Sequence, residues 1–256
     1  MNRLRPSAAV LLALAVGAAA APGMAQQTSS ARLRSFARLP DWSGLWEQYS
    51  SGATGSSDDP AQLKASMAPI RPPYNAEWQK KDAAAAAERA RQPDKACGNI
   101  GFPGLMISSA LMFEVVITPE LTVMHFDFSE TRNIYTDGKP LPPEDERFPT
   151  TWGMSVGHWE GQTLVIDTVS ADSQVTPFGD PISPQATYHE RLRMIDRNTL
   201  EDVLTVNDPM ALTHPWVITR HYHRVPNMTR MVEEECGGNE RDVRVNNTFT
   251  IAPPKQ

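Results

Sequence analysis

The sequence has few cysteines and no excess of positive charge. Among its 256 residues are two cysteines, and its 24 basic and 30 acidic side chains give a net charge of −6. Residues 1–25 carry two arginines and no acidic residue, so without them the net charge is −8. A negative chain has the wrong sign for binding nucleic acid or an anionic membrane surface. These two classes of partner are therefore excluded, and a small molecule is the expected partner.

Several catalytic motifs are also missing. The sequence has no glycine-rich phosphate loop, no alternation of strands with helices and no zinc-finger spacing, so nothing supports nucleotide chemistry. It has no G-x-S-x-G motif, which argues against a serine hydrolase. We therefore expect no cofactor.

The composition is that of a folded protein rich in β-strands. Apolar residues make up 40% of the chain and charged residues 21%, which is too apolar for a disordered chain. The 22 prolines exceed the usual share of about 5%. This excess disfavours a helix bundle and favours strands joined by stiff loops.

The first residues have the pattern of a secretory signal. Arg3 and Arg5 precede the apolar run Ala8–Ala21, and small residues then mark a cleavage site after Ala25. The run is shorter than the ~20 residues that span a membrane, and no other stretch is long and apolar enough. We predict a signal peptide over 1–25, a polar leader over 26–40 and one domain over 41–256, in the periplasm or secreted.

Export determines how the two cysteines are interpreted. In an oxidising compartment Cys97 and Cys236 are expected to form a disulfide. The alternative is two buried free thiols.

One helix and many strands are predicted. Asn75–Arg91 is alanine-rich and lies between prolines, which indicates a helix. A first strand is expected within Asp41–Ser50, and from Met112 short strands alternate with turn signals up to a last strand near 229–236. The fold class is mainly β: an antiparallel lipocalin-like, calycin-type barrel of about 8–10 strands, with one N-terminal helix inserted near 75–91.

The candidate catalytic residues lie on these strands. A two-residue turn at Gly161-Gln162 would pair His158 with Val165 and bring His158 next to Asp167. We expect His158, oriented by Asp167, to act as a general base inside the barrel. His125, His221 or Tyr135 would supply the acid. The alternative is that these side chains face solvent or are structural.

Other polar and aromatic residues are candidates for ligand contacts. Arg132 or Arg220 can hold an anionic group, and stacking walls can come from Trp152, Trp159 and Trp216, unless these are ordinary core residues. No metal is expected. The weaker alternative is an ion held by His221 and His223, two residues apart on one strand, with His125 or Asp127 as a third ligand.

Two resemblances add to these predictions. Gly44-Leu45-Trp46 resembles the G-x-W opening of the lipocalin superfamily, in which the tryptophan closes one end of the barrel. DWSGLWE, CGNIGFPGLM and above all GHWEGQTLVIDT resemble a family of exported, largely uncharacterised bacterial proteins, although Tyr188-His189-Glu190 replaces an expected His-Ser-Glu. The resemblance implies an exported lipocalin-like barrel. Some exported proteins of this kind in aromatic-degrading bacteria resemble cofactor-free lyases acting on lignin-derived biaryls.

Two functions follow as hypotheses. The first is an enzyme that transforms a small apolar or aromatic molecule by cofactor-independent acid–base chemistry, as a lyase or isomerase. The second is a lipocalin-like module that binds such a molecule without turnover.

Overall fold

A computed structural model gives the fold. It describes residues 31–48, 71–91, 101–108, 112–127, 131–172, 181–226, 228–231, 242–245 and 248–251. The predicted signal peptide, Cys97 and Cys236 lie outside the described residues.

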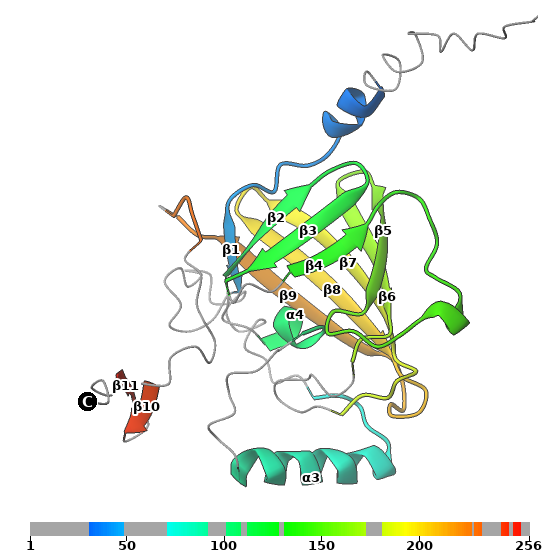
Figure 1. The fold of residues 1–256 in the computed structure, drawn as a ribbon, viewed down its shortest axis with the longest axis vertical. Coiled ribbons are helices and arrows are strands. Elements are labelled where there is room, and N and C mark those ends of the chain that lie inside the picture. Colours follow the sequence, from blue (N-terminus) through cyan, green and yellow to red (C-terminus); the bar gives the residue numbers. More distant parts are fainter. Residues whose placement is uncertain are drawn as a thin grey trace, which may run out of the picture. The chain divides into compact units, whose positions relative to one another are not determined.

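Nine consecutive strands form a closed barrel in the order β1 to β9 (Figure 1). A mainly β fold built on a barrel of 8–10 strands is therefore confirmed. The strands are β1 (Leu45–Gln48), β2 (Met112–Ile117), β3 (Leu121–Phe126), β4 (Thr131–Tyr135), β5 (Met154–Glu160), β6 (Thr163–Val169), β7 (Thr187–Asp196), β8 (Thr199–Asn207) and β9 (Trp216–Arg224).

The hairpin between β5 and β6 has the predicted register. Glu160 pairs with Thr163 and His158 with Val165. The turn needs a glycine, because Gly161 has a φ of +64°. A two-residue turn therefore fixed this register from the sequence alone.

The expectation of an entirely antiparallel barrel is wrong at one place. β4 and β5 run parallel and pair only at Ile134–Ser155 and Tyr135–Val156. A parallel pair needs a long crossover, and the proline-rich segment 136–153 provides it. It contains the 3-10 turn η2 (Glu144–Glu146) and returns the chain to the start of β5. We call this sparsely paired junction the β4–β5 seam.

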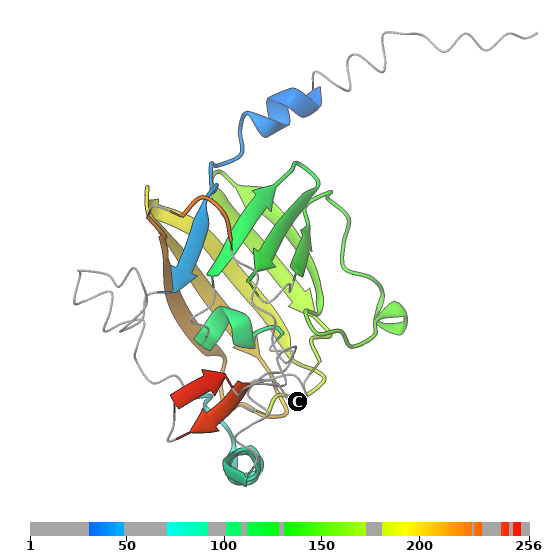
Figure 2. The same cartoon turned by 60° about the vertical axis from the view of Figure 1, so that its left-hand side comes forward.

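A second junction, between β1 and β9, is also short. β1 pairs with β9 only from Tyr222 to Arg224, which leaves the first part of β9 without a partner from β1. The short helix α4 (Gly104–Ser108) lies at this end of the barrel, as the two views agree (Figures 1 and 2). Its carbonyl oxygens at Met106 and Ile107 accept hydrogen bonds from Tyr222 Oη (2.7 Å) and Arg220 Nε, respectively.

The core combines the inner faces of the strands with the residues around α4. Large apolar side chains fill it, and Leu105 and Met106 of α4 are 2% and 1% exposed. Trp46 is fully buried, and the Arg224 guanidinium lies 4.4 Å from its ring centre. Gly44 is required beside this contact, because its φ is +102° and an added Cβ would lie 2.9 Å from Arg224 Nη1.

The alanine-rich segment forms α3 (Ala76–Arg91). Asn75 caps it, because its Oδ1 accepts hydrogen bonds from the backbone N–H groups of Glu77 and Trp78, both at 3.1 Å. Trp78 packs in a small cluster with Tyr74 and Ala211. None of the described helices is both long and apolar enough to cross a membrane.

Two further segments complete the description. Part of the predicted leader, residues 31–36, is helical and belongs to a separate compact unit, Met1–Arg38. The last predicted strand is not seen at 228–231, and its remainder lies outside the described residues. A hairpin that the sequence did not predict is formed by β10 (Asp242–Val245) and β11 (Thr248–Ile251).

Candidate functional site

His158 and Asp167 lie on the outer wall of the barrel. Their side chains are 62% and 53% exposed. Asp167 Oδ1 is 2.8 Å from Nδ1 of His189, which pairs with it across β6 and β7, while His158 faces Glu160 at 3.4 Å. The prediction that Asp167 orients His158 inside the barrel is therefore wrong. Alternation places Trp159 and Leu164 on the inner face, and so the neighbouring polar residues face outward.

The other predicted histidines also lie on outer strand faces. His125 Nδ1 is 3.2 Å from Thr131 Oγ1, and His221 Nε2 is 3.2 Å from Glu201 Oε2. They do not converge with His158 and Asp167 in a pocket, so the predicted catalytic set is not assembled. On β9 the inner face belongs instead to Trp216, Arg220 and Tyr222.

The metal alternative is not supported by the described residues. His223 is buried, and its Nε2 lies 3.7 Å from Glu47 Oε2, whereas His221 faces Glu201. Burial lowers the pKa of His223. Among the described residues, no three His, Cys, Asp or Glu side chains are placed to share an ion.

Arg132, predicted as a ligand contact, is instead part of a buried network. It is fully buried and forms a two-point ion pair with Glu190, through Nη1 at 2.9 Å and through Nη2. Nη2 also donates to Thr168 Oγ1 at 3.1 Å and to Ser155 Oγ at 3.5 Å. The guanidinium lies 4.1 Å from the ring centre of Phe102. The pair thus links β4 to β7 across the barrel, with Ser155 on β5 and Thr168 on β6 attached to it.

A second group of polar residues lies inside the barrel. Asp202 is 2% exposed and faces Arg220 across β8 and β9, and its Oδ1 has no hydrogen-bond partner among the residues that the structure describes. Burial, with the nearby Glu190 carboxylate, raises the pKa of Asp202 well above its ordinary value. Burial likewise raises the pKa of Tyr222 and lowers that of Arg220. Asp202 is therefore favoured in its neutral form.

The three tryptophans differ in their positions. Trp216 is buried in the core, and Trp159 is partly buried with its ring centre 5.3 Å from that of Trp42. Trp152 stacks on Phe126, with ring centres 5.0 Å apart and an angle of 19° between the planes. Of the three, only Trp152 borders the cavity described next.

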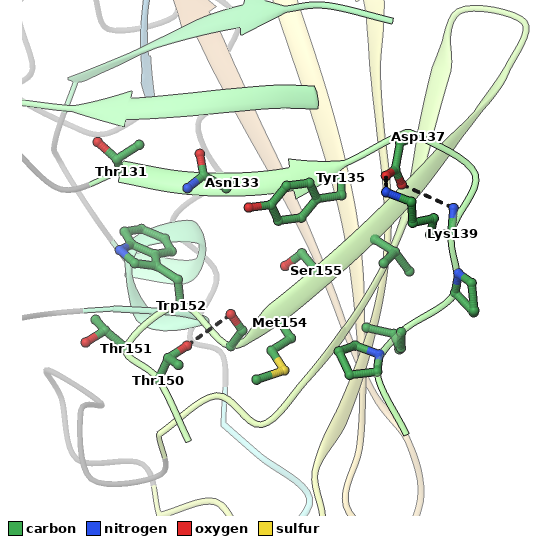
Figure 3. Close-up of a pocket in the computed structure, with 15 residues that line it drawn as sticks. Thr131, Asn133, Tyr135, Asp137, Lys139, Thr150, Thr151, Trp152, Met154 and Ser155 are labelled. Carbon is green, nitrogen blue, oxygen red and sulfur yellow. Dashed lines mark hydrogen bonds and ion pairs between the residues drawn. The ribbon is translucent and has the colours of Figure 1, made fainter. Parts of the chain in front are cut away.

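A cavity of about 580 Å³ lies at the β4–β5 seam, outside the barrel wall and beneath the crossover (Figure 3). We call it the seam pocket. Its size is in the range of small-molecule sites. It exists because only two residue pairs join β4 to β5 and the crossover arches over the gap. It is lined by Thr131, Asn133, Tyr135, Asp137, Lys139, Pro140, Leu141, Pro142, Thr150, Thr151, Trp152, Gly153, Met154, Ser155 and Val156.

The lower wall of the seam pocket is held by a tight turn. Thr150 Oγ1 donates to the Gly153 carbonyl at 3.0 Å, and the Thr150 N–H donates to the Ser170 carbonyl at 3.0 Å. Gly153 has a φ of +67°, and an added Cβ would lie 2.7 Å from the Val169 carbonyl oxygen. Only glycine fits there, and the turn fixes Trp152 in the wall.

The upper wall carries an ion pair and an aromatic ring. Lys139 Nζ lies 2.7 Å from Asp137 Oδ2, and this hydrogen bond lowers the pKa of Asp137 and raises that of Lys139. Tyr135, predicted as an acid, is 52% exposed and borders the cavity. In Figure 3 Ser155 lies between Tyr135 and Met154.

Sequence reasoning missed Ser155, Glu190 and Asp202, and it did not use the crossover. Glu190 lies 58 positions from Arg132, and no local pattern links the two. The length of the crossover was a usable signal, since a long connection permits a parallel pair.

No protein-family model matches the sequence, and no curated protein is significantly similar to it. The resemblance to exported bacterial barrels therefore stays a prediction.

Proposed function

We propose that the protein binds a small aromatic molecule in the seam pocket. The observation that carries this proposal is a cavity of about 580 Å³ walled by Tyr135, Leu141, Trp152 and Met154. Such a cavity buries an aromatic ligand against apolar side chains, and its few polar groups orient it. The walls are already held by the Thr150 and Lys139 contacts, so binding requires little ordering of the protein.

Binding without turnover is favoured over acid–base catalysis. The described residues that line the seam pocket include no histidine, and their one carboxylate, Asp137, is paired with Lys139. A general base must lie within hydrogen-bond reach of the proton that it abstracts. The imidazole best oriented by a carboxylate is that of His189, on the outer face of β7.

We also propose that the barrel is lipocalin-like and exported. The fully buried Trp46, covered by Arg224 and following Gly44, supports the first statement, since it fills the barrel where β1 begins. The parallel β4–β5 pair is a departure from an all-antiparallel lipocalin-like barrel. The Arg3-to-Ala25 pattern supports export, and mass spectrometry of the mature N-terminus tests it.

Calorimetric titration with 2-methylnaphthalene tests the binding proposal. Trp152→Ala removes a wall of the pocket, and we expect it to weaken binding about 10-fold or more. Phe148→Ala is the matched control, because Phe148 is an aromatic residue of the same crossover, is 62% exposed and does not line the pocket. Equal affinities in the wild type and Trp152→Ala would contradict the proposal.

A further inference from the structure

Resting on the proposed function, we infer that the ligand of the seam pocket is a neutral aromatic lactam or amide, whose adjacent N–H and C=O groups pair with the side-chain amide of Asn133. Asn133 lies on the outer face of β4, because Arg132 and Ile134 on either side of it are buried in the barrel. It lines the seam pocket together with Tyr135. In Figure 3 these two side chains lie next to each other, and Trp152 lies below Asn133.

Most other polar side chains in the walls of the pocket already have partners. Ser155 belongs to the buried network around Arg132. The further polar wall residues that take part in interactions within the protein are Thr131, Asp137, Lys139, Thr150, Thr151 and Trp152. In the part of the chain that the structure describes, this leaves the Asn133 amide and the Tyr135 hydroxyl as the polar wall groups without a hydrogen-bond partner. The ligand therefore finds its polar contacts at these two positions.

The chemistry of an amide determines which ligand group fits Asn133. Its side chain presents a donor, the Nδ2–H group, beside an acceptor, Oδ1. A ring that enters the pocket displaces solvent from both, and a donor or acceptor that is then left unpaired weakens binding. A lactam, with N–H next to C=O, pairs with both groups at once. A carboxylate has no hydrogen to donate to Oδ1, and the single oxygen of a phenol serves both groups only through bent hydrogen bonds.

The walls around Asn133 suit a flat, neutral ligand. Trp152 stands in a fixed orientation, because its ring stacks on Phe126. The ion pair between Asp137 and Lys139 has no net charge, so the described wall does not favour a charged ligand. The aromatic wall thus accounts for the ring of the ligand, and the unpartnered amide accounts for its lactam edge.

Three bicyclic probes of similar size test the inference: 2-quinolinone, 4-quinolinone and 2-methylnaphthalene, titrated by calorimetry into the full-length wild-type protein. In 2-quinolinone the N–H and C=O groups are adjacent, whereas its isomer 4-quinolinone carries them on opposite sides of the ring. We expect 2-quinolinone to bind about 10-fold more tightly than 4-quinolinone, because the isomer pairs with only one of the two amide groups. Equal affinities for the two isomers, or tighter binding of 4-quinolinone, overturn the inference and leave the proposed function standing. If none of the three probes binds, the proposed function itself is wrong.

Variants of β4 identify the group that reads the ligand. Asn133→Leu keeps the size of the side chain and removes both polar groups, so we expect it to abolish the preference for 2-quinolinone over 4-quinolinone. Thr131→Val is the matched control, because Thr131 lies two residues earlier on the same face but its hydroxyl faces His125. Tyr135→Phe removes the other unpartnered hydroxyl and keeps the ring. In both of these variants the ratio of the two affinities should stay within about twofold of the wild type, whatever happens to the affinities themselves. A preference that survives in folded Asn133→Leu, or that is lost in either of the other two variants, overturns the inference.

Discussion

Three junctions of the barrel are short: β1 pairs with β2 and with β9 over three residues each, and β4 pairs with β5 over two. Two of them, β1–β9 and β4–β5, differ in what lies beside them. At the first of these, helix α4 lies next to the inner face of β9, and Arg220 and Tyr222 donate to its carbonyl groups. At the second, the crossover arches away from the wall and leaves a cavity of about 580 Å³.

We call the β1–β9 junction, which lies next to helix α4, the sealed seam, and the β4–β5 junction, which borders the cavity, the open seam. At the sealed seam the polar side chains of β9 form hydrogen bonds within the protein, so they are not available to a ligand. The β4–β5 seam is fastened from the inside, by the Arg132–Glu190 pair and the hydroxyl groups of Ser155 and Thr168, so its outer side stays accessible. We therefore expect each seam to be stabilised by its own side-chain contacts, and we expect only the contacts of the open seam to affect ligand binding.

Breaking the buried Arg132–Glu190 pair at the open seam should cause the largest loss of stability. Arg132→Met leaves the buried Glu190 carboxylate without its partner, which we expect to lower the free energy of unfolding by about 3–5 kcal/mol in urea denaturation. The matched control is Arg191→Met, because Arg191 pairs with Glu160 on the surface at 2.8 Å. That change is expected to cost less than about 1 kcal/mol. Equal losses in the two variants would contradict the account.

The buried acid behind the sealed seam should make stability depend on pH. The raised pKa of Asp202 means that the folded state holds a proton that the unfolded state releases above its ordinary pKa. Stability is therefore fully present at low pH and falls as the pH rises towards the folded-state pKa, by ~1.4 kcal/mol per pH unit. The Asp202→Asn side chain does not titrate, so the stability of this variant does not fall with pH for this reason. The free energy of unfolding of the variant relative to the wild type should therefore be larger at about pH 8 than at about pH 5. An advantage that does not change between these pH values excludes the raised pKa.

Loosening the sealed seam should have a moderate effect on stability alone. Tyr222→Phe removes the hydrogen bond to the Met106 carbonyl and keeps the ring, which we expect to cost about 1 kcal/mol in thermal unfolding. The affinity for 2-methylnaphthalene should not change. If this variant weakens 2-methylnaphthalene binding as much as Trp152→Ala does, the two seams are not independent.

Side chains on the outer wall of the barrel should contribute least to stability and to ligand binding. Asp167→Asn weakens the exposed pair with His189, and we expect less than about 1 kcal/mol in stability and no change in 2-methylnaphthalene affinity. Denaturation and titration measure both quantities. A large loss of affinity would place the ligand on the outer face of β6 and β7.

Most of the strands and one register could be predicted from the sequence, because they depend on local patterns. The Gly161-Gln162 turn set the pairing of His158 with Val165. On β9 the acid and metal roles were assigned to His221 and His223, whereas the inner face carries Trp216, Arg220 and Tyr222. The bulk of Trp216 and Tyr222 marks the inner face more reliably than the histidines do.

The site could not be predicted, because it depends on contacts between distant segments. Arg132 and Glu190 meet across the barrel, and the pocket lies where β4 and β5 pair over only two residues. A polar Ser155 on an inward position carried no local signal. The crossover between Tyr135 and Met154 was visible as a long proline-rich loop, and its length was the one indication of the parallel pair.

The most direct test is to locate the bound ligand by NMR, using protein with labelled methionine methyl groups and 2-methylnaphthalene as the probe. Met154 lines the seam pocket, whereas Met106 and Met124 are buried in the core, at 1% and 0% exposure. Single Met→Leu variants assign the three signals. The account predicts intermolecular NOEs from the naphthalene ring to the Met154 methyl group and none to the other two. NOEs to Met106 or Met124 without one to Met154 would place the ligand inside the barrel and contradict it.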